Sequence, residues 1–342
     1  MKTEKLVLLN DTFDEEWDDF VYHHPDGTLF HTTKWLKCCV NNQSADMFRL
    51  GFLANDKLIG ICPIFIKWFG LIKVVASPMV VEDTPFMGPL VKQEECFADF
   101  LEAIEKWIRN KHVNFSRIIL SDRTKATLYT KSGYFEMIRH THVLDLSQGK
   151  EEVWKNMKSN ARNHIRKAEK NDVQYHFSED PHHLEKYYQL AKILYMSQGK
   201  VIPNSKTFYN EICFGQLSTN SKLLIAEHDN KIIAAAILVY FKDQLYYLDA
   251  VSDKQFLKFR APSGMQWFII QWAIDNGFKY YDFVGSDMPW IAKFKAGFGG
   301  ELHEYSLFEK ASPQWIFALR SLYGKKINPL VQKIKSQVPL WK

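Results

Sequence analysis

The chain of 342 residues repeats part of its own sequence at a spacing of about half its length. Residues 107–122 and 272–287 both read as the end of an amphipathic helix, a short turn and a buried strand that closes on Ser-Asp. Upstream, residues 48–66 resemble residues 222–241, and each segment reads as two apolar runs joined by a polar Asn/Asp-Lys turn. Two antiparallel hairpins are therefore expected, one in each half.

The similarity continues downstream, where Lys131-Ser-Gly-Tyr-Phe corresponds to Lys295-Ala-Gly-Phe-Gly. Three resemblances in the same order indicate a duplication rather than chance. Each half then reads helix, hairpin, third strand, helix, strand, short helix, strand. This order predicts the α/β (α+β) class, with two tandem domains that each contain a mixed, largely antiparallel sheet flanked by helices. Because a strand ends in Ser-Gln-Gly at 147–149, we place the domains at 1–148 and 149–310, followed by a basic helical tail at 311–342.

Cysteine and histidine spacing excludes several kinds of chemistry. The five cysteines lack any C-x-x-C pair, which argues against a zinc site and indicates reduced thiols in a cytoplasmic protein. Neither H-E-x-x-H nor G-x-S-x-G occurs, so we expect no metal and no nucleophilic serine. No tightly bound cofactor and no DNA partner are expected.

The apolar segment 58–81 is interrupted by Pro63, Lys67, Lys73 and Pro78, so its uninterrupted stretches are too short to span a bilayer. It predicts two buried strands joined at 67–70 instead.

Positive charge is concentrated at the C-terminal end. The formal net charge is +5, and residues 311–342 contain no acidic residue but six basic ones, Arg320, Lys325, Lys326, Lys333, Lys335 and Lys342. Three interpretations are open: a solvated helical surface, contact with anionic lipid headgroups, and contact with nucleic acid such as tRNA. Together with the turn Lys67-Trp68-Phe69-Gly70, the tail suggests peripheral contact with the inner face of a membrane.

Residues 150–173 carry two stripes at helical spacing. The apolar stripe is expected to pack inward; its members are Val153, Met157, Ala161, Ile165 and Ala168. The cationic stripe recurs every four residues; its members are Lys158, Arg162, Arg166 and Lys170, with Lys155 and Lys167 beside it. Like charges at this spacing repel, so an anionic ligand would stabilise the stripe. The stripe is either a site for a phosphate-bearing substrate or a solvated basic surface.

A second group of polar residues lies in residues 281–301. A buried strand with Asp282 leads into Gly-Ser-Asp, and a short helix then presents Lys295 ahead of three glycines. We place Lys295 nearest the reaction, where it would stabilise a phosphate or a developing oxyanion. Asp282 would accept the proton of an attacking amine. The alternatives are a lysine that only caps the helix, as the matching Lys131 suggests, and a buried structural carboxylate.

Arg260-Ala-Pro-Ser-Gly precedes a predicted helix, whose free backbone N–H groups could receive an anion such as pyrophosphate. We therefore assign Arg260, Ser263 and Gly264 to the binding of a donor.

Several of these segments resemble the FemABX peptidyltransferases and their relatives in the GNAT superfamily. Residues 162–170, RNHIRKAEK, resemble the RNxIRKAEK signature of these families. Further matches, over roughly 30–308, are the opening segment 30–35, a Gly-to-Pro element at 199–203 with Phe208-Tyr209, Asp282-Phe283 with Gly285, Phe294-Lys295, and Phe298-Gly299-Gly300-Glu301.

The resemblance implies a tandem of acyl-CoA N-acyltransferase-like (GNAT-like) domains and transfer of an acyl or aminoacyl group to an amine. The donor would be acyl-CoA or aminoacyl-tRNA, and the acceptor an anionic or lipid-linked cell-envelope precursor or a sugar. By the same resemblance, the substrate site would include Lys37, Asn163, Lys167, Tyr209, Gly285, Ser286 and Phe298. The alternative is a non-catalytic module of the same fold that binds an anionic glycan precursor, tRNA or a membrane surface.

Overall fold

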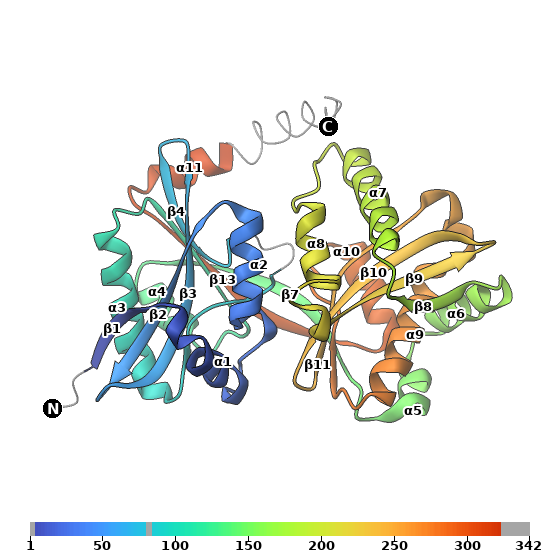
Figure 1. The fold of residues 1–342 in the computed structure, drawn as a ribbon, viewed down its shortest axis with the longest axis horizontal. Coiled ribbons are helices and arrows are strands. Elements are labelled where there is room, and N and C mark those ends of the chain that lie inside the picture. Colours follow the sequence, from blue (N-terminus) through green and yellow to red (C-terminus); the bar gives the residue numbers. More distant parts are fainter. Residues whose placement is uncertain (1–3, 80–83, 323–342) are drawn as a thin grey trace. The chain divides into compact units, whose positions relative to one another are not determined.

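The fold was analysed on a computed structural model, in which residues 4–79 and 84–322 are described (Figure 1). The chain forms two compact units. Within the described residues, unit 1 contains residues up to 139 together with 304–322, and unit 2 contains residues 140–303.

Unit 1 is built on a mixed sheet with the strand order β1-β2-β3-β4-β6-β13. Neighbouring strands are antiparallel except for the parallel pair β4 and β6. Its elements are β1 (Glu4–Leu9), α1 (Asp14–His23), α2 (Thr33–Gln43), β2 (Asp46–Ala54), β3 (Lys57–Phe69), β4 (Ile72–Ser77), β5 (Leu90–Val91), α3 (Phe97–Asn110), β6 (Phe115–Leu120), α4 (Ala126–Lys131), the first part of β7 (Phe135–Asp145), most of β13 (Glu301–Ala311) and α11 (Trp315–Leu322). Helix α3 supplies much of the core, with Phe100 stacked on Phe52 at 4.9 Å between ring centroids.

Unit 2 repeats this plan with the strand order β7-β12-β11-β10-β9-β8, in which β11 and β12 form the parallel pair. Its further elements are α5 (Gly149–Asn156), α6 (Ser159–Lys170), β8 (Gln174–Ser178), α7 (Pro181–Ser197), α8 (Lys206–Cys213), β9 (Ser221–His228), β10 (Lys231–Phe241), β11 (Gln244–Ser252), α9 (Ala261–Asp275), β12 (Tyr280–Asp282) and α10 (Pro289–Lys295). Short 3₁₀ helices occur at Asp11–Phe13, Leu29–His31, Glu94–Cys96, Ser218–Asn220, Lys254–Phe259 and Ala296–Phe298. The predicted order from the hairpin onward is confirmed in both halves, but the edge strands β1 and β8 and the short strand β5 were not predicted.

Matching hairpin turns explain why the two halves begin alike. Asn55 and Asp56 join β2 to β3, with φ of 49° and 61°, and Asp229 and Asn230 join β9 to β10, with φ of 49° and 57°. Two successive residues of positive φ form the turn whose twist fits an antiparallel hairpin, and Asn and Asp tolerate that backbone. The polar dipeptide in each half therefore fixes the register of its hairpin.

The compact units divide at different points from the predicted domains 1–148 and 149–310. Residues 143–145 of β7 pair with β12 in unit 2, although β7 closes the first half of the sequence. Residues 306–311 of β13 pair with β6 in unit 1, although β13 closes the second half. Each half thus contributes its last strand to the other unit's sheet, which no local pattern reveals.

The predicted tail begins as a helix, since α11 covers Trp315–Leu322. Residues 323–342, with Lys325, Lys326, Lys333, Lys335 and Lys342, lie outside the described residues. The two strands predicted within 58–81 are β3 and β4, joined at Gly70 and Leu71. Among the helices described, none is long and apolar enough to cross a membrane.

Candidate functional site

Strands β11 and β12 of unit 2 are hydrogen-bonded neighbours over a short distance. The parallel ladder joins Gln244–Tyr246 to Tyr280–Asp282 and, within the described residues, ends there, although β11 continues to Ser252. Because helix α9 connects these two strands, its N-terminus lies at their carboxyl ends. Carboxyl ends of parallel strands are where ligands bind in open α/β sheets. The end of this ladder is therefore the candidate position of a ligand-binding site.

The chain leaves β12 through a turn with an unusual backbone. Val284 and Gly285 both have positive φ, 50° and 60°. Glycine adopts this conformation freely, whereas a β-branched residue does so only under strain. Asp282 Oδ1 accepts a hydrogen bond from the Val284 N–H at 2.7 Å and another from the Thr141 hydroxyl. The carboxylate thus holds the turn from one side.

Lys295 holds the same turn from the other side. It is the last residue of α10, and its ammonium group donates hydrogen bonds to the carbonyls of Val284 and Gly285. The side chain is buried, and burial lowers the pKa of Lys295 to about 8. The negative charges of Asp282 and Asp287 oppose this shift because they raise the pKa. The matching Lys131 of the first half is exposed. Lys295 is therefore not a solvated lysine that both halves share.

Burial also raises the pKa of Asp282, while its hydrogen bonds from Thr141 and Val284 and the charge of Lys295 lower it. Asp282 and Lys295, the two predicted catalytic residues, are brought together in the structure. Both contact the backbone of the turn, so their observed contacts position the turn.

The turn also places Ser286 against a histidine that sequence reasoning missed. The Ser286 hydroxyl lies 2.8 Å from His142 Nδ1, and both side chains are buried. Burial lowers the pKa of His142, and the positive charges of Lys295 and Lys158 lower it further. Lys158 therefore belongs to the same cluster, and its backbone N–H donates to the Gly297 carbonyl at 2.9 Å. Thr141 and His142 come from β7, so no local spacing marks them.

The predicted continuous helix over residues 150–173 is interrupted. The backbone is extended at Met157 and Lys158, which separates α5 from α6. The predicted apolar face is confirmed, since all five of its members, Val153, Met157, Ala161, Ile165 and Ala168, are buried.

One member of the cationic stripe, Arg162, has contacts within the protein. Arg162 Nη1 donates to the carbonyls of Trp154, Lys155 and Met157 at 3.2, 2.8 and 2.6 Å, which caps the end of α5. The guanidinium of Arg166 lies 5.5 Å from the centre of the Trp154 ring. Arg162 thus has a structural role that the sequence analysis did not foresee. Lys167 and Lys170 are exposed, and so is Asn163, which the resemblance assigned to the substrate site.

The N-terminus of α9 has a separate group of basic residues around it, the cations Arg260 and Lys167 and the histidine His164. Arg260 is the N-cap residue, with φ of 62°, and no side chain caps this end. Burial lowers the pKa of His164 from α6, and the charges of Arg260 and Lys167 lower it further, so these three side chains lie near one another. A helix N-terminus with adjacent cations favours an anion. Arg260 therefore lies at a helix N-terminus, as the sequence predicted, whereas its proximity to His164 and Lys167 was not predicted.

Ser263 and Gly264 are buried within α9. A Cβ atom at Gly264 would lie 2.0 Å from the Tyr175 hydroxyl and 3.1 Å from the Ala168 Cβ atom. The glycine therefore allows α6 and β8 to approach α9, which is a packing role.

A half-buried acid on β11 was also missed. Asp249 lies beyond the last ladder residue, at the irregularity where β11 shifts register against β10. Its Oδ2 accepts a hydrogen bond from the Tyr187 hydroxyl and its Oδ1 accepts one from the Ala250 N–H at 2.8 Å. Burial raises the pKa of Asp249, and hydrogen bonds from Tyr187, Ala250 and Tyr209 oppose that shift. The predicted residue Tyr209 is thus part of the surroundings of Asp249.

Two further predicted residues have structural contacts of their own. Phe298 is buried, with its ring centre 5.1 Å from that of Phe294, and is part of the core of unit 2. Lys37 belongs to unit 1, where its Nζ lies 2.7 Å from Asp14 Oδ2. The hydrogen bond from Asp14 raises the pKa of Lys37.

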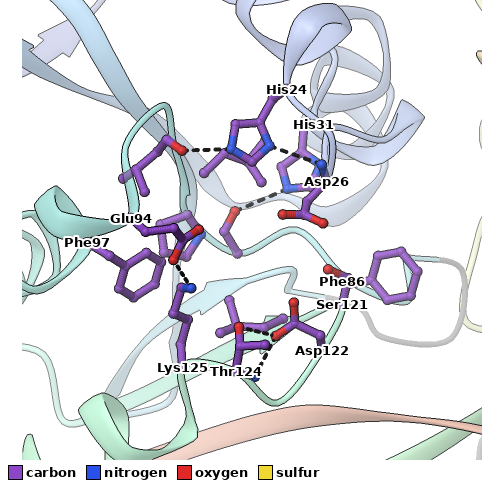
Figure 2. A pocket seen from close by; sticks show the side chains of 15 residues that line it. His24, Asp26, His31, Phe86, Glu94, Phe97, Ser121, Asp122, Thr124 and Lys125 are labelled. Atoms are coloured by element: carbon purple, nitrogen blue, oxygen red, sulfur yellow. Dashed lines mark hydrogen bonds and ion pairs between the residues drawn. The ribbon is translucent and has the colours of Figure 1, made fainter.

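Unit 1 contains a cavity of about 250 Å³ between β6 and the 3₁₀ turn that precedes α2 (Figure 2). His24 Nε2 lies 2.8 Å from the Val91 carbonyl, and His31 Nε2 lies 3.1 Å from the Gly88 carbonyl. Lys125 is paired with Glu94. These contacts give both histidines a structural role, and the lining residues described include none that the sequence analysis assigned to the site.

Comparison with known proteins identifies the class of this fold. Residues 155–292 match the family model described as an acetyltransferase (GNAT) domain. That segment contains α6, the parallel pair β11 and β12, and the turn at 284–285. This segment of the chain is therefore similar to a GNAT domain.

Solved structures extend the similarity to the whole tandem. The structure of FemX is similar with a TM-score of 0.70 and 15% identity, over 92% of this chain and 99% of that one. L-PGS from Bacillus licheniformis matches with a TM-score of 0.59 and 12% identity, over 91% and 97% of the two chains. A tandem GNAT protein from the clavulanic acid biosynthesis pathway matches with a TM-score of 0.57 and 9% identity, over 90% and 98%. The predicted FemABX-like fold with two GNAT-like halves is confirmed, and it is an acyltransferase fold.

Proposed function

We propose that this protein is an N-acyltransferase that moves an acyl or aminoacyl group from an activated, phosphate-bearing donor to an amine. The observation that carries the proposal is the end of the β11–β12 ladder at Tyr246 and Asp282, next to the cationic N-terminus of α9. Backbone amide groups at a strand edge can pair with an extended donor, and the helix N-terminus can receive its phosphates.

The cations Arg260 and Lys167 would bind the anionic part of the donor, and His164, whose pKa is lowered, would donate a hydrogen bond to it as a neutral imidazole. Acyl-CoA and aminoacyl-tRNA share this chemistry, since each carries phosphate groups beside an activated carbonyl. The acceptor would be an amine of a sugar or a cell-envelope precursor.

In the proposed reaction, the amine nitrogen attacks the donor carbonyl carbon, and the tetrahedral intermediate then expels a thiolate or a ribose oxygen. The amine loses a proton and the leaving group gains one. Much of the acceleration would come from holding the two reactants together, because the donor is already activated. Asp282 and Lys295 would act as positioning residues that fix the turn beside the ladder end.

We assign proton acceptance to Asp249, on the part of β11 beyond the ladder. Its raised pKa brings the carboxylate closer to the pH at which it can take a proton efficiently. Asp249→Asn should lower kcat about a hundredfold or more with little change in donor affinity. Asp243→Asn is the matched control, because Asp243 lies just before β11 and pairs with Lys279.

The test is a binding and turnover screen with two donor arms. Acetyl-CoA and a charged tRNA are titrated separately, and transfer to amino sugars is followed by mass spectrometry. Binding of either donor supports the proposal and identifies its source. Arg260→Ala should weaken binding of that donor about tenfold, the size of one lost charge-assisted hydrogen bond.

Lys231→Ala is the control for Arg260→Ala, because Lys231 is exposed and its loss changes net charge equally. If neither donor binds at low salt and no amine is acylated, the protein is a non-catalytic module and the proposal fails. An equal loss of binding in both variants would show only nonspecific attraction and would contradict the assigned site.

A further inference from the structure

The tip of the β3–β4 hairpin in unit 1 is an unusual patch of exposed apolar side chains. Phe69 pairs with Ile72, so a two-residue turn of Gly70 and Leu71 joins the strands. Leu71 is 94% exposed, Trp68 59% and Phe69 54%. Large apolar side chains gathered in this way mark a surface that contacts something other than water.

Lysines surround these side chains at short range. Lys67 Nζ lies 5.7 Å from the centre of the Phe69 ring, and Lys73 Nζ lies 5.5 Å from the centre of the Trp68 ring. Both lysines are fixed, since Lys67 donates to the Gln43 carbonyl at 2.5 Å and Lys73 to the Lys111 carbonyl at 2.8 Å. The tip therefore combines apolar side chains with two lysines, and its own two strands carry no acidic residue.

Helix α11 adds a further tryptophan beside the hairpin. Ile316 and Phe317 pack with Ile72 and Val74 of β4, so α11 lies against this strand, as Figure 1 also shows. Trp315, the first residue of the helix, is 58% exposed. The hairpin and the helix belong to the same unit, and their relative placement rests on these contacts.

We infer that the tip formed by Trp68, Phe69 and Leu71, together with Trp315, inserts into the headgroup region of an anionic lipid bilayer. Tryptophan is favoured at that depth, where its ring is apolar and its N–H stays hydrated. Lysines beside the tip would meet anionic headgroups. A stable protein interface buries on the order of 1,000 Å² or more, which a two-residue turn and the side chains beside it cannot supply, whereas a bilayer accepts a narrow apolar tip. The inference does not depend on the transferase reaction.

The experiment is flotation of the full-length protein with vesicles of phosphatidylcholine alone and of phosphatidylcholine with phosphatidylglycerol. We expect binding to the anionic vesicles at low salt that weakens as salt is added. The variant Trp68→Ser/Phe69→Ser/Leu71→Ser should lose at least tenfold in partitioning. Because these side chains are exposed, its melting temperature should equal that of the wild type, which verifies that it folds.

Phe135→Ser is the matched control, because Phe135 is 63% exposed and lies in the same unit. It should bind vesicles like the wild type. Absence of wild-type binding at low salt would overturn the inference, as would a triple variant that binds as well as the wild type. The latter result would assign membrane binding to basic residues elsewhere in the chain.

Discussion

Asp282 and Lys295 bind the two polar backbone groups of the same residue, Val284. The Asp282 carboxylate accepts from the Val284 N–H, and the Lys295 ammonium donates to the Val284 carbonyl. Val284 has positive φ, which a β-branched residue adopts only when its surroundings impose it. The two side chains supply that constraint, so the strained turn and the acid–base pair form one structural unit beside the end of the β11–β12 ladder.

Removal of Lys295 should therefore affect both stability and turnover. In Lys295→Ala the carbonyls of Val284 and Gly285 lose a shared buried donor. We expect a loss of about 1–3 kcal/mol in the free energy of unfolding, the cost of leaving a buried acceptor unsatisfied, and a large fall in kcat. Urea unfolding and steady-state kinetics measure the two effects.

Lys131→Ala is the control for that variant, because Lys131 occupies the corresponding position in the first half and is exposed. It should change the free energy of unfolding by less than about 0.5 kcal/mol. Equal effects of the two substitutions would refute the distinction between the buried and the exposed lysine.

The parts of the fold that depend on local sequence patterns could be predicted from the sequence. Asn55-Asp56 and Asp229-Asn230 each specify a hairpin turn, and the apolar positions 153, 157, 161, 165 and 168 are buried as their spacing predicts. Lys295 and Asp282 were singled out because glycines and a buried strand surround them.

The site residues that the sequence did not predict depend on contacts between segments far apart in the chain. Thr141 and Asp282 are separated by 141 positions, and they meet only because β7 pairs with β12. Neither proline nor glycine occurs at the helix break at Met157 and Lys158, so the sequence does not indicate the break. The break directs Arg162 onto the carbonyls that end α5. A side chain that the charge pattern assigned to ligand binding therefore caps a helix. Residue spacing indicates which residues share one face of a helix, but it does not indicate which groups that face contacts.

The pKa of Lys295 predicts a specific dependence of stability on pH. Its folded value of about 8 lies below the ordinary value of 10.5, so the unfolded chain binds more protons between these limits. The contribution of Lys295 to stability should therefore be complete above pH 10.5 and diminish as the pH falls through about 8. The difference in unfolding free energy between wild type and Lys295→Met should increase from pH 8 to pH 10. A difference that stays constant over this range would contradict the lowered pKa; Lys131→Met should show such a constant difference.

Arg162→Met tests the capping role of the arginine. The substitution keeps an apolar stem of similar length but leaves the carbonyls of Lys155 and Met157 without their side-chain donor. We expect a loss of about 1–2 kcal/mol in the free energy of unfolding, as for other lost helix caps and hydrogen bonds. Lys170→Met, on the same helix and exposed, should be neutral within about 0.5 kcal/mol. If Arg162 acts only on a ligand, both variants will unfold alike and only substrate affinity will differ.

Val284→Gly separates the strain of the turn from its function. Glycine adopts the observed φ of 50° without steric cost, which returns about 1–2 kcal/mol of strain. It also frees the unfolded chain by about 0.5–1 kcal/mol, so the two effects nearly cancel and stability should change little. Val284→Ala keeps most of the strain and serves as the control.

A turn that no longer resists motion should hold Ser286 and the ends of β11 and β12 less firmly. We therefore expect kcat to fall about tenfold or more in Val284→Gly at nearly constant melting temperature, because small misplacements of positioning groups are costly to catalysis. Calorimetry measures the melting temperature of the variant, and single-turnover kinetics measure the rate of its chemical step. A large loss of stability would show that the Val284 side chain acts mainly by packing, whereas unchanged kinetics would show that the strained backbone has no part in the reaction.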